Sequence, residues 1–251
     1  MPRITTNSAG MQNHKLGGNF NFTAKRIEHL GATEYTLVTI AVDESGSVFS
    51  FKSELEKMLV AAVESCKRSP RSDNLLVRVL FFSDKYPKGA LEVHGFKPLA
   101  DIDTTAYATL SPGGNTPLCD ACYSGVGAMN KYGKDLADQD YLANGICFFI
   151  TDGGENASIA TMAMVKDELQ KAVTGEYLES MVSVLIGVNA TYCKSILEDF
   201  RREAGIDKFI DAGEATPAKL AKIADFVSRS ISSQSQSLGT GGPSQQIAAV
   251  I

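Results

Sequence analysis

Four short runs of apolar, mostly β-branched and aromatic residues recur along the chain, separated by segments with apolar residues at helical spacing. Such short, continuously apolar runs are typical of strands buried on both faces of a parallel sheet. The alternation therefore predicts an α/β fold, namely a Rossmann-like doubly wound, mostly parallel sheet flanked by helices on both faces. The runs are TLVTIAV at 36–42, LLVRVLFF at 75–82, ICFFI at 146–150 and MVSVLIGV at 181–188.

Weaker signals predict the remaining elements. Residues 91–96 predict a shorter, more polar strand at the sheet edge or antiparallel to its neighbour, and residues 208–211 predict another short strand. Residues 20–34 are ambiguous, with a short edge strand or a hairpin arm as the favoured interpretation. Helical spacing predicts helices over 48–66, 117–132, 158–173, 191–204 and 217–231, the last capped by Thr216 and opened by Pro217.

Composition divides the chain into one domain and two tails. The 251 residues suit a single large domain. Residues 1–19 are polar and rich in Gly and Asn, which predicts a flexible N-terminal segment. Residues 232–251 become rich in Ser, Gln and Gly, which predicts a flexible C-terminal tail. The folded domain is therefore expected to span residues 20–231.

Charge and hydropathy exclude several classes of function. A formal net charge of −5 argues against a nucleic-acid binder, which would usually carry a basic face. No apolar run approaches the roughly 18 residues that a membrane-spanning helix needs. The first residues are polar and lack the apolar core of a signal peptide, so a cytoplasmic protein without a membrane partner is expected.

The five cysteines do not form a disulfide framework, because their number is odd and their spacing does not repeat. Cys119 and Cys122 form a C-x-x-C pair, which raises a redox or zinc interpretation. No second pair follows, and His14, His29 and His94 lie elsewhere without ligand spacing. Reduced, structural cysteines are therefore the expectation.

Oxygen-bearing residues gather after two of the predicted strands and in one glycine-rich loop. Asp43, Ser45 and Ser47 follow the first apolar run, Asp152 follows the third, and Thr116 lies in the segment GGNTPL. Because the carboxyl ends of parallel strands meet at one edge of a sheet, both carboxylates should emerge together. Two carboxylates and three hydroxyls suit Mg²⁺ or Mn²⁺ better than zinc, which prefers nitrogen and sulfur ligands.

The charge of this ligand set indicates what the site would do. Two carboxylates neutralise a divalent ion, and three neutral hydroxyls add no further charge. The ion would remain electrophilic and could accept a carboxylate from another molecule. The set therefore predicts a docking site in which the metal is part of the contact surface.

These residues resemble the metal-ion-dependent adhesion site (MIDAS) of the von Willebrand factor A (VWA) domain family. The D-x-S-x-S pattern is Asp43, Ser45 and Ser47, the threonine is Thr116, and the aspartate of the TDG segment is Asp152. The resemblance implies that Ser45, Ser47 and often Thr116 contact Mg²⁺ directly, and that the two aspartates act largely through waters. It suggests a non-enzymatic module whose partner protein offers an Asp or Glu, such as an AAA+ ATPase or a component of another multiprotein system. Asn115, between the glycines and Thr116, departs from common forms of the motif.

Each segment alone has an ordinary structural interpretation, as a polar turn, a helix cap or a flexible loop. Two other functions remain open: a Mg²⁺-dependent hydrolase or phosphotransferase, and a structural assembly subunit. Against the enzyme, the chain lacks a phosphate-binding P-loop, a nucleophile elbow and a histidine near the motif. Glu44 and Glu155, beside the motif, are expected to be solvated, and Asp120 is expected to favour the dipole of the helix that contains it.

Overall fold

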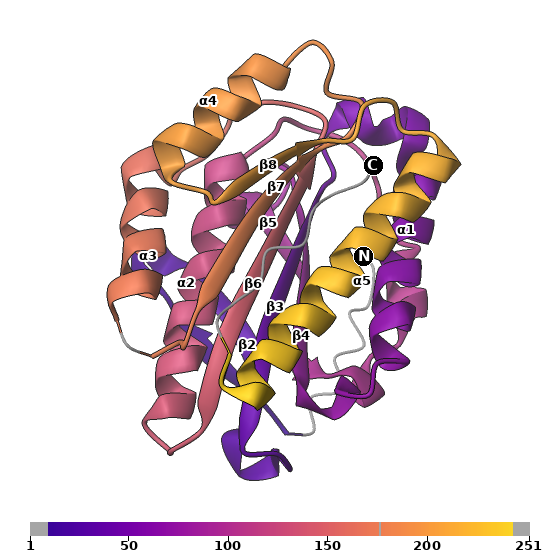
Figure 1. Cartoon of the computed structure of the whole chain (residues 1–251). Coiled ribbons are helices and arrows are strands. Elements are labelled where there is room, and N and C mark those ends of the chain that lie inside the picture. Colours follow the sequence, from indigo (N-terminus) through magenta and orange to yellow (C-terminus); the bar gives the residue numbers. More distant parts are fainter. Residues whose placement is uncertain (1–9, 176, 243–251) are drawn as a thin grey trace.

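The computed structural model describes residues 10–175 and 177–242 and contains an eight-stranded sheet between two layers of helices (Figure 1). The strand order is β1-β2-β5-β4-β3-β6-β7-β8. The strands are β1 Met11–Lys15, β2 Asn21–Lys25, β3 Glu34–Asp43, β4 Leu75–Phe82, β5 Ala90–Pro98, β6 Leu142–Thr151, β7 Met181–Gly187 and β8 Lys208–Asp211. The helices are α1 Lys52–Lys67, α2 Leu118–Ala137, α3 Met162–Thr174, α4 Lys194–Ala204 and α5 Pro217–Thr240.

The centre of the sheet is parallel, as the apolar runs predict. β3 pairs in parallel with β4 on one side and β6 on the other, and β7 and β8 continue the parallel order. After β3 the chain first adds β4 and β5 on one side of it, and later adds β6, β7 and β8 on the other side. The strand order reverses at β3 and β6, which is where ligands bind in open α/β sheets, beyond the carboxyl ends of the strands.

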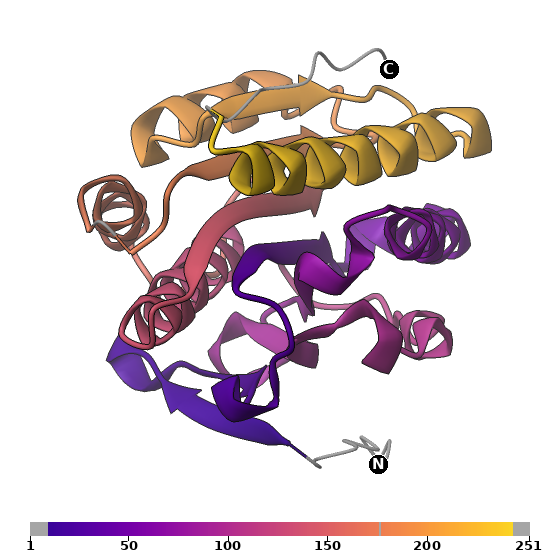
Figure 2. The same cartoon turned by 60° about the horizontal axis from the view of Figure 1, so that its bottom comes forward.

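Two apolar cores hold the layers together, and β3 contributes to both. Leu37 and Ala41 pack in the core under α2, α3 and α4, whereas Val38, Ile40 and Val42 pack in the core under α1 and α5. Successive side chains of a strand point to opposite faces, so a strand covered on both sides is apolar on both faces. Figure 2 shows helices on both sides of the sheet. The doubly wound prediction is confirmed.

The N-terminal boundary differs from the prediction. β1 lies inside the segment expected to be flexible, and it pairs antiparallel with β2, so the hairpin-arm interpretation of residues 20–34 is confirmed. Phe20 and Phe22 are buried, and burying these rings offsets the entropy lost by ordering the hairpin. Residues 1–9 lie outside the described part of the chain.

Strand β5 was predicted to lie at the sheet edge or to run antiparallel to its neighbour. It is antiparallel to β4, but it lies inside the sheet, between β4 and β2. The hydrogen bonds of Glu92 show how a polar residue of this strand is accommodated inside the sheet. The Glu92 carboxylate accepts hydrogen bonds from Arg78 Nε at 2.7 Å and from the Thr23 backbone N–H at 2.9 Å. A buried charge is acceptable when it is paired and hydrogen-bonded, and this network joins β4, β5 and β2.

The C-terminal boundary is also different, because α5 continues past residue 231 to Thr240. The Ser- and Gln-rich end of the helix is docked by polar contacts: Asn144 Nδ2 donates to the Gln234 backbone oxygen at 2.8 Å, and Arg71 Nε donates to Ser235 Oγ at 3.0 Å. Leu238 is buried as well. The expected tail 232–251 is therefore helical over its first part, and residues 243–251 lie outside the described chain.

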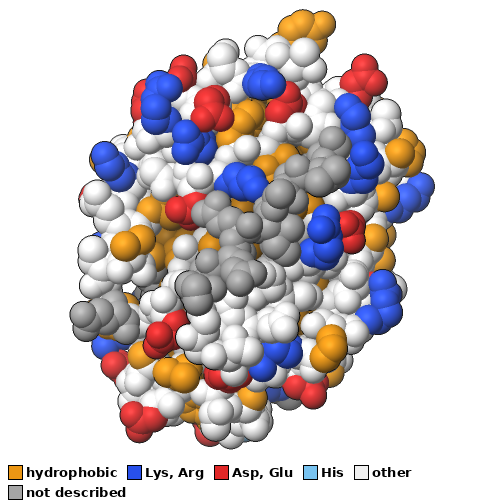
Figure 3. All heavy atoms as spheres, viewed as in Figure 1, with side chains coloured by type: hydrophobic (Ala, Val, Ile, Leu, Met, Phe, Trp, Pro, Cys, Tyr) orange, Lys and Arg blue, Asp and Glu red, His pale blue; other side chains and the backbone are white. Residues whose placement is uncertain are grey.

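None of the described helices is both long and apolar enough to cross a membrane. The five cysteines are free, four of them buried and Cys193 half-buried, as expected for structural thiols. On the face that carries α5, Lys and Arg side chains are interspersed with Asp and Glu and form no basic stripe (Figure 3).

Candidate metal site

The candidate site begins at the end of β3, where Asp43 is almost completely buried. One carboxylate oxygen accepts the Ser45 backbone N–H at 2.7 Å, and the other accepts the Thr151 hydroxyl at 2.6 Å. These bonds fix the carboxylate against the neighbouring strand β6. They also curl the chain after β3 into a turn, so that a 3₁₀ helix over Gly46–Phe51 starts at once and carries Ser47.

A continuous chain of side-chain contacts links the next three predicted residues. The hydroxyl oxygens of Ser45 and Ser47 are 3.1 Å apart, and Ser47 Oγ donates to Asp152 Oδ1 at 2.8 Å. Ser47 and Asp152 are far apart in sequence, and the switch point between β3 and β6 brings them together. Four of the five predicted residues are therefore joined directly or through one backbone N–H.

Thr116 reaches the same edge from the loop before α2. A Cβ placed on Gly153 would lie 3.3 Å from Thr116 Oγ1, so this hydroxyl faces the residue next to Asp152. The Thr116 backbone N–H donates to Asn156 Oδ1 at 2.8 Å, and the Asn156 N–H donates back to the Thr116 oxygen at 3.1 Å. The Thr116 side chain makes no capping bond to α2, whose N-cap residue is Pro117. The structure thus brings all five predicted residues to one edge.

The loop that carries Thr116 is held in place by Gly114 of the motif segment and by Asp84, which lies outside the motif. Gly114 adopts a left-handed φ of +76°, which favours glycine, and its carbonyl accepts the Gly46 N–H at 3.0 Å. Asp84, after β4, accepts the Asn115 backbone N–H and its side-chain amide, each at 2.7 Å. Asn115, the departure from the common motif, is therefore a fixed part of the loop.

The expectation that Glu44 and Glu155 are solvated is wrong. Glu44 is fully buried, accepts the Ser111 N–H and pairs with Lys85 Nζ at 3.3 Å. Glu155 accepts backbone N–H groups of Cys119 at 2.6 Å and Ser158 at 2.8 Å. Both carboxylates accept from backbone N–H groups, in loops or in the first turn of α2, that have no partner in a helix or strand. This need outweighs solvation.

Asp120 has a related role. It is buried, and Oδ1 accepts the Ile159 N–H at 3.0 Å and the Ala160 N–H at 2.6 Å. It therefore joins the first turn of α2 to the loop after β6, in addition to any interaction with the helix dipole. The sequence alone did not reveal the roles of Glu44, Glu155 and Asp120, because most of their backbone partners are distant in sequence.

The electrostatics of the site favour a cation. Burial raises the pKa of Asp43 to about 6, and burial also raises the pKa of Asp152. No Lys or Arg among the described residues forms an ion pair with either carboxylate. Two acids that share a site and lack a cationic partner are costly to ionise, and a divalent ion would remove that cost.

The donor chemistry fits a hard ion. No group of three or more His, Cys, Asp or Glu side chains within the described chain is arranged to hold a metal. The candidate site offers three hydroxyls beside two carboxylates. An all-oxygen set completed by waters suits Mg²⁺ or Mn²⁺.

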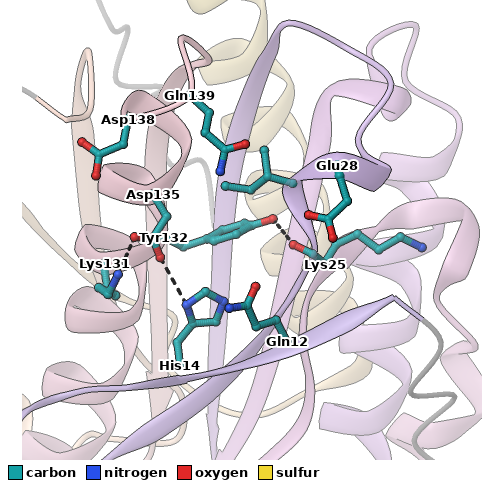
Figure 4. A pocket seen from close by; sticks show the side chains of 10 residues that line it. Gln12, His14, Lys25, Glu28, Lys131, Tyr132, Asp135, Asp138 and Gln139 are labelled. Atoms are coloured by element: carbon teal, nitrogen blue, oxygen red, sulfur yellow. Dashed lines mark hydrogen bonds and ion pairs between the residues drawn. The ribbon is translucent and has the colours of Figure 1, made fainter.

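A pocket of about 320 Å³ lies at the end of α2 away from the candidate site, between that helix and β1 (Figure 4). His14 Nδ1 lies 3.2 Å from Asp135, which also pairs with Lys131, and Tyr132 donates to the Lys25 backbone oxygen at 2.5 Å. Burial lowers the pKa of His14. In this pocket, Asp135 is paired with both His14 and Lys131, whereas the two carboxylates of the candidate metal site have no cationic partner among the described residues.

Comparison with protein-family models and with curated proteins finds no match to this sequence. Solved structures do match. The chain superposes on proximal thread matrix protein 1 (PTMP1) from the mussel byssus, in a form with a zinc-occupied MIDAS motif, with a TM-score of 0.51 and 18% identity over 80% of this chain and 47% of that one. The pilus adhesin SpaC from Lactobacillus rhamnosus GG gives a TM-score of 0.57 with 11% identity over 89% of this chain and 32% of that one.

The vWF domain of the type V pili tip protein Mfa5 from Porphyromonas gingivalis gives a TM-score of 0.50 with 10% identity, covering 87% of this chain and 99% of that domain. The chain spans less than half of PTMP1 and about a third of SpaC. At these identities the likeness concerns the fold, which is of the von Willebrand factor A type.

Proposed function

We propose that this chain is a metal-dependent protein-binding module. Asp43, Ser45, Ser47, Thr116 and Asp152 would hold one Mg²⁺ or Mn²⁺, and a partner protein would add an Asp or Glu carboxylate to the ion. The observation that carries the proposal is the convergence of these five side chains from three loops onto one edge of the sheet.

The charge balance supports docking rather than simple storage of the ion. Two carboxylates neutralise a divalent ion and leave it able to attract a further anionic ligand. When bound, the ion supplies an electrophilic contact for the partner's carboxylate. The protein's own contribution is to hold Asp43 and Asp152 rigidly through the bonds from Thr151, Ser45 and Ser47.

The structural neighbours support this proposal at the level of the fold. PTMP1 has been solved with zinc at a MIDAS motif, and SpaC is a pilus adhesin. Mg²⁺ or Mn²⁺ is preferred here because the ligand set contains neither nitrogen nor sulfur. The partner class, which includes AAA+ ATPases and components of other multiprotein systems, and the cytoplasmic setting are further parts of the proposal. Cell fractionation would test the setting.

No observation favours the hydrolase or phosphotransferase. A general base would have to lie within hydrogen-bond reach of a reacting group. His94 Nε2 is instead within 2.7 Å of the Tyr107 hydroxyl, and His14 pairs with Asp135 at the opposite end of α2. The proposal therefore describes a module without catalytic residues.

Metal binding is the first test. We expect calorimetry, and electron paramagnetic resonance of Mn²⁺, to show one site in the full chain, with binding lost in Asp152→Ala. Asp138→Ala, which changes an exposed acid at the far end of α2, is the matched control and should bind normally. Equal binding by Asp152→Ala would refute the assignment of the site.

A further inference from the structure

Large exposed apolar side chains are distributed unevenly over the described part of the chain. Those at least about a third exposed are Phe49, Leu142, Ile159, Val173, Tyr177, Tyr192 and Ile196. Phe49, Ile159, Tyr192 and Ile196 all lie on segments that follow the carboxyl ends of β3, β6 and β7, the edge with the candidate metal site. We call these four residues the apolar collar.

Two collar residues lie beside the Asp152 loop on the α4 side. A Cβ placed on Gly154 would come within 2.9 Å of Ile196 Cγ2, so this side chain covers the loop next to Asp152. The neighbouring Cys193 thiol donates to the Asp152 backbone oxygen at 3.2 Å, which places the start of α4 against the same loop. Tyr192, directly before it, is fully exposed at 101%.

The other two collar residues flank the site from different loops. Phe49 lies two positions after Ser47 in the same 3₁₀ helix and is 75% exposed. Ile159 is 72% exposed and lies in the loop after β6. Its backbone N–H donates to Asp120 of α2, and the same loop contains Asn156, which accepts the Thr116 backbone N–H. The collar residues therefore lie on two of the segments that carry the site, after β3 and β6, and on the adjacent segment after β7.

Two lysines at this edge, in the loop after β4 and at the start of α4, are already paired. Lys85 pairs with the buried Glu44 at 3.3 Å, and Lys194 pairs with Asp211 at 2.9 Å. A partner's carboxylate would therefore find its positive charge in the ion rather than in Lys85 or Lys194. The surface around the ion instead offers apolar contact.

We infer that the partner of this chain presents one Asp or Glu with apolar side chains on both sides, and that these side chains pack on the apolar collar. This inference rests on the proposed docking function and specifies the chemistry of its partner. Apolar groups around the ion exclude water and so strengthen the contact between the ion and the carboxylate. Exposed apolar side chains that cluster around a polar centre are also a common mark of a protein interface.

The test uses two displayed libraries of random peptides, one with a fixed central Asp and one with Asn in its place. Both are panned on the full chain in Mg²⁺ and eluted with EDTA. We expect only the Asp library to yield binders, with apolar residues enriched on both sides of the Asp. The triple variant Phe49→Ser, Tyr192→Ser, Ile196→Ser should bind the most enriched peptide at least about tenfold more weakly.

Two controls separate the inference from the proposed function. Val173→Ser, at an 81% exposed position at the end of α3, should leave peptide affinity unchanged, and the triple variant should bind Mn²⁺ as tightly as the original chain. If the Asp library yields EDTA-eluted binders without apolar flanks, or the triple variant binds them normally, the inference fails and docking stands. If Mn²⁺ binds but neither library yields binders, or both yield them equally, docking itself fails.

Discussion

Replacing Asp43 by Asn should stabilise the metal-free protein at neutral pH, although it removes a residue of the candidate site. Burial raises the pKa of Asp43 from 3.8 to about 6, so the folded protein holds this proton more tightly than the unfolded chain does. The free energy of unfolding must then fall as pH rises from about 4 to about 6, and stay lowered above that.

The size of the effect follows from the shift. One pKa unit corresponds to about 1.4 kcal/mol, so a change from 3.8 to about 6 corresponds to about 3 kcal/mol of lost stability at pH 7. Asn carries no charge and avoids this loss. It can keep the local bonds, because its oxygen can accept the Ser45 N–H and its amide can donate to the Thr151 hydroxyl.

Urea unfolding of both proteins between about pH 4 and pH 8 would measure the effect. In EDTA, the difference in unfolding free energy should grow in favour of Asp43→Asn by up to about 3 kcal/mol as pH rises. In saturating Mg²⁺, the original chain should recover about 2.7 kcal/mol at a hundredfold excess over Kd, whereas the variant should not respond. Identical pH profiles in EDTA would refute the burial argument, and an equal response to Mg²⁺ would refute the role of Asp43.

Three further outcomes are expected. Thr116→Ala should abolish Mg²⁺-dependent binding of an acidic peptide, yet leave the metal-free Tm within about 2 °C, since Thr116 caps no helix; an unchanged peptide affinity would contradict this. Asp84→Ala should weaken Mn²⁺ affinity by about tenfold in calorimetry, because Asn115 loses both hydrogen bonds to the Asp84 carboxylate. A normal affinity would show that the loop does not need this carboxylate. A chain ending at residue 231 should lose at least about 2 kcal/mol of stability in urea, whereas one ending at Gly242 should not, and equal stability would show that the end of α5 is dispensable.

The sequence was sufficient to predict the central part of the fold. Strands β3, β4, β6 and β7 are buried on both faces, so most of their positions are apolar, and this makes them visible as runs. The positions of Asp43 and Asp152 follow from the same logic, because parallel strands that end at one edge deliver their next residues to that edge. The five site residues were brought together as expected, although their binding of a metal stays a prediction.

The parts that the sequence could not show depend on distant partners. β1 is polar and is ordered by pairing with β2, and the end of α5 is ordered by Asn144 and Arg71. The composition of both tails predicted flexibility, because strand pairing and hydrogen bonds to distant residues cannot be deduced from composition. Glu44 appeared solvated for the same reason, since its partner Ser111 lies in another loop. The spacing of apolar residues in a local sequence shows which positions are buried. It does not show which loops are joined by hydrogen bonds.

A crystal structure of the full chain grown with millimolar Mn²⁺, with anomalous scattering recorded at the manganese edge, would test the central claim most directly. We expect one strong anomalous peak among the side chains of Asp43, Ser45, Ser47, Thr116 and Asp152, and no peak there in a matched crystal of Asp43→Ala. A manganese ion bound elsewhere, or no ion at this edge of the sheet, would contradict it.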